Sequence, residues 1–393
     1  MSTPAIALVS YPAVPANGGF TGSTTEYWAQ AQAIQSAQDA QSRQDHYQLQ
    51  IEEAARIRMR KRQRLFTWMY NILAIGELVY FIVGLYMIEW QVADLQDNPL
   101  LGPGQEGILK MGGTYTPRII QRHQYWRLIS SLFHNAGAIH ITSNMGMVWT
   151  FGHFLVREIS PWLVALVFFA AGLSGLLVSV NVGAEFSTAG ASIPAFGLAG
   201  AATAMLLFRW RRFTCHFASA AVVGFIVGAN AFIGATPFVD NSGNTAGFVF
   251  GAVICLGIMM VRREKTDTKI GGLLVYVIAV GAVAALLAAI VGGLAGLQLD
   301  TPIAGCCDEW VCTSSSLWRC NASRINICTL TTYVNDTPIL TCPQGNRIAV
   351  SFGASSTADA VQTLCDSLCS SGASMVSSGG GSSGNTDTSQ RRM

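Results

Sequence analysis

One apolar run of this chain contains Gly190-Ala191-Ser192-Ile193-Pro194-Ala195-Phe196-Gly197-Leu198, in which a serine is framed by small residues. A serine at the start of a helix is surrounded by backbone N–H groups that have no partner within the helix. Such groups can stabilise the oxyanion that forms when a serine attacks a carbonyl carbon. Pro194 suits a first helical turn, where its missing N–H does no harm. Serines flanked by glycine and alanine also occur where helices pack closely, so the motif alone leaves both interpretations open.

A second informative stretch lies downstream and reads Val239-Asp240-Asn241-Ser242-Gly243-Asn244-Thr245-Ala246-Gly247. It continues into Gly247-x-x-x-Gly251, a spacing that lets another backbone approach a helix closely. We therefore expect a tightly packed helix after Asn244.

The composition defines the physical class of the protein. Of 393 residues, 51% are hydrophobic and only 12% are charged, which is too apolar for an ordinary soluble domain. Apolar runs long enough to cross a bilayer, or nearly so, occur near residues 66–89, 140–156, 161–181, 192–210, 217–238, 246–261 and 271–297. The sequence thus predicts an all-α polytopic membrane protein with seven helices, although hydropathy alone gives five or six.

Basic residues predict the orientation of these helices. Three clusters precede the first helix, end the fourth, and separate the sixth from the seventh, so seven spans place them all on one side. The clusters are Arg56, Arg58, Arg60, Lys61, Arg62 and Arg64; Arg209, Arg211 and Arg212; and Arg262, Arg263, Lys265 and Lys269. Positive residues favour the cytosolic side. We expect a cytosolic N-terminus and a lumenal or extracellular C-terminus.

Cysteine usage agrees with this orientation. Eight of the ten cysteines follow the last helix: Cys306, Cys307, Cys312, Cys320, Cys328, Cys342, Cys365 and Cys369. An even set in an oxidising compartment predicts disulfide bonds, without defining their pairing. Two glycosylation sequons, Asn321-Ala322-Ser323 and Asn335-Asp336-Thr337, lie in the same tail. A zinc site is the competing interpretation, but no histidine follows His216 and no Cys-x-x-Cys spacing occurs.

The chain divides into four regions. We expect a cytosolic N-terminal region at 1–65, disordered at first and then helical, and a seven-helix domain at 66–298 with a long first loop at 90–126. A cysteine-rich tail follows at 299–370, and residues 371–393 form a disordered Ser/Gly-rich terminus.

Two polar residues in the second predicted helix could carry chemistry. His140 and Asn144 are four residues apart and so share one helix face. They could donate hydrogen bonds into a cavity, or they could simply join neighbouring helices.

The order and spacing of these motifs resemble the rhomboid family over about residues 60–298. The resemblance rests on Tyr125-Trp126-Arg127, His140-x-x-x-Asn144, Gly190-Ala191-Ser192, Phe196-Gly197-Leu198, Val239-Asp240-Asn241 and Gly247-x-x-x-Gly251. The seventh helix and the basic clusters look like the eukaryotic secretory-pathway branch. The tail stretch Leu317-Trp318-Arg319-Cys320-Asn321 is similar to plant rhomboid-like proteins.

This resemblance implies a six-helix rhomboid core with a seventh C-terminal helix, and an intramembrane serine protease that cuts transmembrane substrates with a Ser–His dyad. Ser192 matches the nucleophile, His140 and Asn144 match the oxyanion-stabilising positions, and Trp126-Arg127 matches a structural motif. The family's base histidine falls on Asn244. No cofactor and no metal are implied.

Several departures from the family pattern affect the expected activity. Asn244 has no basic nitrogen and cannot act as a general base, and losing a histidine base costs about a millionfold in turnover. Ile193-Pro194 replaces the usual Gly-Ala and could crowd the substrate cleft, and Asn135 replaces an earlier histidine. The histidines that could supply another base are His46, His123, His134, His140, His153 and His216.

Three functional hypotheses follow. The leading one is a rhomboid-like protein of the secretory pathway, inactive as a protease, that binds transmembrane clients and affects their trafficking or degradation. The second is an active protease that cuts near the outer membrane face. The third is a membrane-anchored, disulfide-rich binding module. The expected partners are transmembrane proteins and the lipid bilayer, and not nucleic acid.

Overall fold

The computed structural model describes most of the helical region of the chain. It covers residues 24–120, 122–182, 187–210, 215–263 and 269–297, and then 318, 329–334, 337–341, 347–350, 364 and 368. The chain forms two compact units, Met1–Arg64 and Leu65–Met393. The expected disorder at the N-terminus falls on residues 1–23, which lie outside the described residues.

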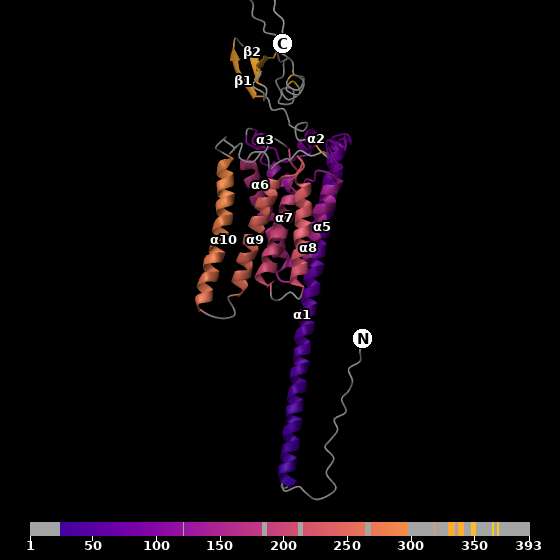
Figure 1. Ribbon diagram of the computed structural model, residues 1–393, viewed down its shortest axis with the longest axis vertical. Helices are drawn as coiled ribbons and strands as arrows, with labels where there is room; N and C mark the ends of the chain where they lie inside the picture. Colours follow the sequence, from indigo (N-terminus) through magenta and orange to yellow (C-terminus); the bar gives the residue numbers. More distant parts are fainter. Residues whose placement is uncertain are drawn as a thin grey trace, which may run out of the picture. The chain divides into compact units, whose positions relative to one another are not determined.

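The described part of the chain is mostly helical (Figure 1). Its long helices are α1 (Thr24–Met87), α5 (Ala138–Leu155), α6 (Pro161–Val182), α7 (Ser192–Phe208), α8 (His216–Ile233), α9 (Asn241–Arg263) and α10 (Lys269–Gly296). Each of the seven predicted apolar runs coincides with one of them. Within the described residues, four helices are long and apolar enough to cross a membrane: α1, α6, α8 and α9. The number of actual crossings stays a prediction.

The start of α9 differs from the sequence-based expectation, and the difference matters for Asn244. The helix begins at Asn241, five residues before the predicted apolar run. The carboxylate of Asp240 accepts the backbone N–H of Gly243 at 2.8 Å, which is the bond of a helix N-cap. The side chains of Ser179 and Ser242 also donate to Asp240. Asn244 therefore lies in the first turn of a helix rather than in a loop.

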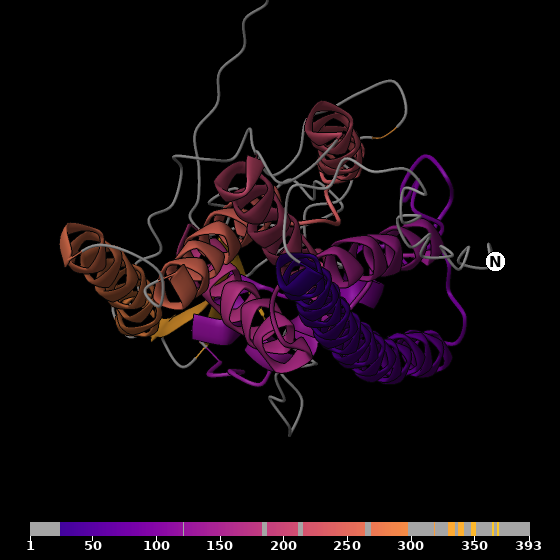
Figure 2. The ribbon, with the colours of Figure 1, turned by 90° about the horizontal axis from the view of Figure 1, so that it is seen from below.

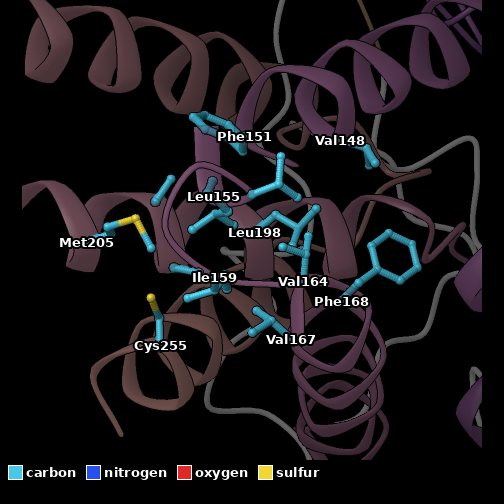
Figure 3. Packing of buried hydrophobic residues seen from close by; sticks show 14 of the residues in the cluster. Val148, Phe151, Leu155, Ile159, Val164, Val167, Phe168, Leu198, Met205 and Cys255 are labelled. Carbon is cyan, nitrogen blue, oxygen red and sulfur yellow. The ribbon is translucent and has the colours of Figure 1, made fainter. Parts of the chain in front are cut away.

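The centre of the helical unit is α7, which is buried along nearly its whole length. It packs against α5, α6 and α9. Figure 3 shows side chains from these four helices meeting in one apolar cluster, with Phe151 from α5, Phe168 from α6, Leu198 and Met205 from α7 and Cys255 from α9. The parallel bridge between Ala189 and Val239 places the N-terminal turns of α7 and α9 at the same end.

Glycines bring α7 and α9 into backbone contact, as the Gly247-x-x-x-Gly251 spacing predicts. A Cβ atom on Gly251 would overlap the carbonyl oxygen of Gly197, and one on Gly200 would overlap that of Phe248. A Cβ atom on Gly247 would lie 2.6 Å from the carbonyl oxygen of Ile193. No residue larger than glycine fits these positions without moving the helices apart.

The outer helices are held by fewer contacts. Figure 2 looks along the helices and shows α10 at the edge of the group, beside α9. The side chain of Asn181 on α6 donates to the carbonyl of Gly293 on α10 at 3.0 Å. On the other side, α8 exposes most of its surface, and Ser143 of α5 donates to Asn230 of α8.

The long loop predicted at 90–126 contains regular structure. It includes α2 (Gln105–Lys110) and α3 (Thr116–Ile120), and α4 (Arg127–Ser130) and the short 3-10 helix η1 (Ser131–Phe133) follow it. The guanidinium of Arg127 donates to the carbonyls of Leu109 and Gly113 at 2.9 and 2.8 Å and stacks on Trp126. This supports a structural role for the Trp-Arg pair.

The tail contains a small sheet that the cysteine pattern did not predict. Three antiparallel strands, β1 (Thr329–Val334), β2 (Thr337–Thr341) and β3 (Arg347–Ala349), pair in that order. The eight tail cysteines and the two sequon asparagines lie outside the described residues. Among the described cysteines, Cys215 and Cys255 are free.

Candidate functional site

Ser192 occupies the position that the sequence predicts, at the first residue of α7. The side chain is 2% exposed, and its Oγ atom has no hydrogen-bond partner among the described residues. Pro194 follows in the first turn, where its missing N–H leaves no gap in the helix. The hydroxyl is therefore buried, and the described residues leave it able to form a hydrogen bond with another group.

The segment that leads into Ser192 is held by backbone hydrogen bonds on two sides. Ala189 pairs with Val239 in a parallel bridge, and its N–H donates to the carbonyl of Phe238 at 2.9 Å. Thr188 pairs with Thr114 of the first loop in an antiparallel bridge. Ser192 is therefore fixed to the segment that begins α9.

A second pair of bonds joins the same segment to the connector before α5. The N–H groups of Gly190 and Ala191 donate to the carbonyls of Ser131 and His134, both at 3.1 Å. These bonds connect the Ser192 turn to the residues just before His140 and so assemble the site from three separate parts of the chain.

Asn244 lies in the first turn of α9 and is 1% exposed. Neither polar atom of its side-chain amide has a partner among the described residues. Ile193, the neighbour of Ser192, contacts Gly243 and Gly247 on either side of Asn244 in sequence. The two candidate residues thus belong to helix starts that are in direct contact.

Ile193 and Pro194, which could crowd the substrate cleft, lie in helix interfaces in this arrangement. The side chain of Ile193 is fully buried against Gly175 of α6 and the glycines of α9. The ring of Pro194 lies against Gly172 of α6. Both side chains fill helix interfaces that glycines leave open, so the substitution is accommodated by packing.

His140 has a defined tautomer in this site. Its Nδ1 atom accepts the backbone N–H of Ala136 at 3.0 Å, so the proton of the neutral ring lies on Nε2. The Nε2 atom is buried and has no partner among the described residues. His140 therefore offers a hydrogen-bond donor, as an oxyanion position requires, and cannot accept a proton there.

Asn144 is engaged by a neighbour that the sequence did not connect with it. Its side-chain nitrogen donates to Oδ1 of Asn135 at 2.9 Å. The side-chain nitrogen of Asn135 donates in turn to Glu77 of α1 at 2.8 Å. Sequence analysis missed Glu77, although a single charged residue in the apolar segment 66–87 is a recognisable signal.

Several buried polar atoms of these residues have no partner among the described residues. They include Ser192 Oγ, both amide atoms of Asn244, His140 Nε2 and Asn144 Oδ1. Buried polar groups in proteins are nearly always satisfied, by ordered water where protein groups are missing. These atoms are therefore available to bond ordered water or a polar segment of a ligand.

None of the described histidines is hydrogen-bonded to Ser192. The backbone of His134 is bonded to the Ser192 turn, because its carbonyl accepts a hydrogen bond from the N–H of Ala191. Its ring, however, packs against Tyr80 of α1. His153 lies 13 residues after His140 on α5, about 20 Å along the helix. His46 and His123 are exposed, and the ring of His216, at the start of α8, lies tilted against that of Trp210 with 4.6 Å between their centres.

Burial governs the ionisation of two groups in the connector before α5. It lowers the pKa of His134 to about 3, with a further contribution from the charge of Arg127. It also lowers the pKa of Arg127 to about 10, so this guanidinium stays charged near neutral pH. His134 is neutral there.

The arrangement defines the chemistry available to the site. It has a buried hydroxyl at a helix N-terminus and one imidazole donor, but no basic group is bonded to the hydroxyl among the described residues. Such a site can bind a polar backbone segment. Amide hydrolysis by a serine requires a proton acceptor for the hydroxyl, and no side chain in the described part of the chain is hydrogen-bonded to Ser192 Oγ in that role.

The candidate residues fall within a recognised domain. Residues 122–263 match the family model described as Rhomboid domain, and this range contains Ser192, Asn244, His140 and Asn144. This part of the chain is therefore similar to the rhomboid family, whose members are embedded in membranes.

Among known proteins, the chain is similar to plant rhomboid-like proteins. It is 24% identical over 336 residues to RHOMBOID-like protein 1 of Arabidopsis thaliana, covering 77% of this chain and 86% of the relative. It is 30% identical over 183 residues to RHOMBOID-like protein 2, covering 47% and 57%. It is 25% identical over 199 residues to Inactive RHOMBOID-like protein 8, again covering 47% and 57%. The family thus includes a member named as inactive.

Proposed function

We propose that this protein is a rhomboid pseudoprotease that binds transmembrane clients without cutting them. The observation that carries the proposal is Asn244, which stands where the family pattern has the base histidine and is buried in the first turn of α9. A neutral amide cannot take the proton of Ser192. The same site keeps unpartnered polar atoms that can hold a peptide backbone.

The proposed clients are transmembrane proteins, because the site lies between helices that are buried against one another and apolar outside. In this proposal all seven long helices cross the membrane, with the N-terminus in the cytosol of a secretory-pathway membrane. The cysteine tail then lies in the lumen or outside the cell, where its cysteines form disulfides and its sequons accept glycans. Binding would affect the trafficking or degradation of the clients.

The test is a comparison of client behaviour with and without the serine hydroxyl. Clients are captured with wild-type protein by crosslinking in membranes and identified by mass spectrometry, and their abundance is then followed in cells that carry Ser192→Ala. The proposal expects the same clients and the same abundance, because no covalent step is involved. Accumulation of uncut client with Ser192→Ala would contradict it.

An active protease is the second candidate function. Ser192 at a helix N-terminus and the free Nε2–H of His140 favour it, because both are parts of an oxyanion-stabilising site. It predicts that a transmembrane reporter is cut by wild type and spared by Ser192→Ala. A relocated base would be needed, and His134 is the described histidine whose backbone contacts the Ser192 turn.

A further inference from the structure

Glu77 is a buried carboxyl group in the apolar part of α1. Its side chain is 1% exposed, and none of the ion pairs among the described residues includes it. Acidic side chains inside membrane-spanning helices are costly, so they are rarely present without a purpose. The purpose here can be read from the hydrogen bonds that Glu77 receives.

Glu77 begins a relay of side chains that ends at the candidate site. Its Oε2 atom accepts from Asn135 Nδ2 at 2.8 Å, and Asn135 Oδ1 accepts from Asn144 Nδ2 at 2.9 Å. All three side chains are buried, with at most 1% exposed. The relay joins α1 to α5 through the connector between them.

The direction of this relay follows from the chemistry of its first member. An ionised carboxylate can only accept, so beside Glu77 in that form Asn135 turns its nitrogen toward Glu77 and its only side-chain oxygen toward Asn144. Asn144 must then offer its nitrogen to Asn135. Asn144 then keeps its Oδ1 acceptor beside the second N–H of its amide, and Oδ1 is buried without a partner among the described residues.

We propose that Glu77 is a positioning residue that sets the orientation of the Asn135 and Asn144 amides, so that Asn144 presents a hydrogen-bond acceptor to the site beside Ser192. An oxyanion needs donors, and an acceptor at that position repels it. The consequence for catalysis rests on the proposed function. In that function the missing base is one obstacle to cutting, and an acceptor at Asn144 is a second. The orientation itself does not depend on that function.

The relay can be reversed by a side chain that donates at position 77. In Glu77→Gln the new amide can donate to Asn135 Oδ1, and Asn135 Nδ2 can then donate to Oδ1 of Asn144. A residue at position 144 that can only accept hydrogen bonds should therefore be tolerated only when the relay can reverse its direction. Asn144→Asp is such a substitution, because both of its oxygens accept.

The experiment is a double-mutant cycle on the thermal unfolding of the full-length protein in lipid nanodiscs. We expect Asn144→Asp to lower the midpoint by about 5 °C, because it sets an oxygen against Asn135 Oδ1. We expect Glu77→Gln alone to change it little and Glu77→Gln with Asn144→Asp to recover at least about half of the loss. Among the described residues, hydrogen bonds connect residues 77 and 144 through Asn135, so the losses from ordinary damage to packing would add rather than cancel. No recovery would overturn the proposal.

Relief of charge repulsion between Glu77 and the new aspartate must be separated from reversal of the relay. Repulsion acts through space and does not need Asn135. The cycle is therefore repeated with Asn135→Leu, or with Asn135→Ala if the larger side chain prevents folding. Loss of the recovery supports the relay, whereas its persistence would overturn it. Cleavage of a reporter by wild type would contradict the proposed function and leave this result unchanged.

Discussion

The backbone N–H of Ala189 donates to the carbonyl of Phe238, and this bond of 2.9 Å ties the turn that carries Ser192 to the segment that starts α9. Ala189 also forms a parallel bridge with Val239, directly before the capping residue Asp240. Ser192 and Asn244 are consequently held in register by main-chain bonds. Changing the side chain at 244 should leave the position of Ser192 intact.

The first prediction concerns the contact between α7 and α9. We expect Gly251→Ala to lower the unfolding midpoint by several degrees, because the new methyl group overlaps the carbonyl oxygen of Gly197 and forces two backbones apart. Gly228→Ala on α8 is the matched control, since a Cβ atom there has no neighbour within 4 Å. It should be neutral or slightly stabilising. Equal losses in both variants would contradict the close packing.

The second prediction concerns pH. The pKa of His134 is lowered to about 3 in the folded protein, whereas an unfolded histidine titrates near 6.5. Between these values the unfolded state binds the extra proton, so folding stability falls as pH is lowered below 6.5, by about 1.4 kcal/mol per pH unit from this group. His134→Gln should therefore flatten the decline in midpoint between pH 6.5 and 4.5.

The matched control for this pH series is His46→Gln, which removes an exposed histidine of α1. It should follow the wild-type slope. A slope that is the same for wild type and His134→Gln would show that His134 is not buried as a neutral ring.

The third prediction concerns partial repair of the site. We expect Asn244→His to give weak cutting of a transmembrane reporter, because a base returns while Asn144 still presents an acceptor. Losing one oxyanion donor costs about a hundredfold to a thousandfold in turnover. Adding Glu77→Gln to Asn244→His should raise the initial rate, since Asn144 can then turn its nitrogen toward the oxyanion.

Rates for this comparison are measured with purified protein in proteoliposomes, and Ser192→Ala in each background sets the zero. Damage to the fold lowers activity, so it cannot explain a higher cleavage rate after Glu77→Gln. Equal rates with Glu and Gln at position 77 would mean that Asn144 already serves as a donor.

Local rules in the sequence predicted some parts of the structure well. The helix start at Ser192 follows from a proline in its first turn, and the close contact of α9 follows from glycines spaced four apart. The start of α9 was placed too late, because a polar turn hid the cap that Asp240 provides. Regular structure within the first loop was missed for a similar reason, since short helices give little periodicity.

The polarity of the site could not be predicted from the sequence. Glu77 and Asn135 are 58 residues apart, and their bond depends on how α1 packs against the connector. The tautomer of His140 likewise depends on a backbone N–H that only the turn at Ala136 places beside the ring. The sequence shows which residue types are present. Which atom of each side chain is left to form a hydrogen bond in the site depends on the fold.

The most direct measurement of the central claim is cleavage of a transmembrane reporter by wild-type protein and by Ser192→Ala in the same membranes. The site has no proton acceptor bonded to Ser192 among the described residues, so we predict no difference in cleaved product between the two. An active rhomboid protease assayed in parallel shows that the reporter can be cut. Product that forms with wild type and disappears with Ser192→Ala would contradict the claim.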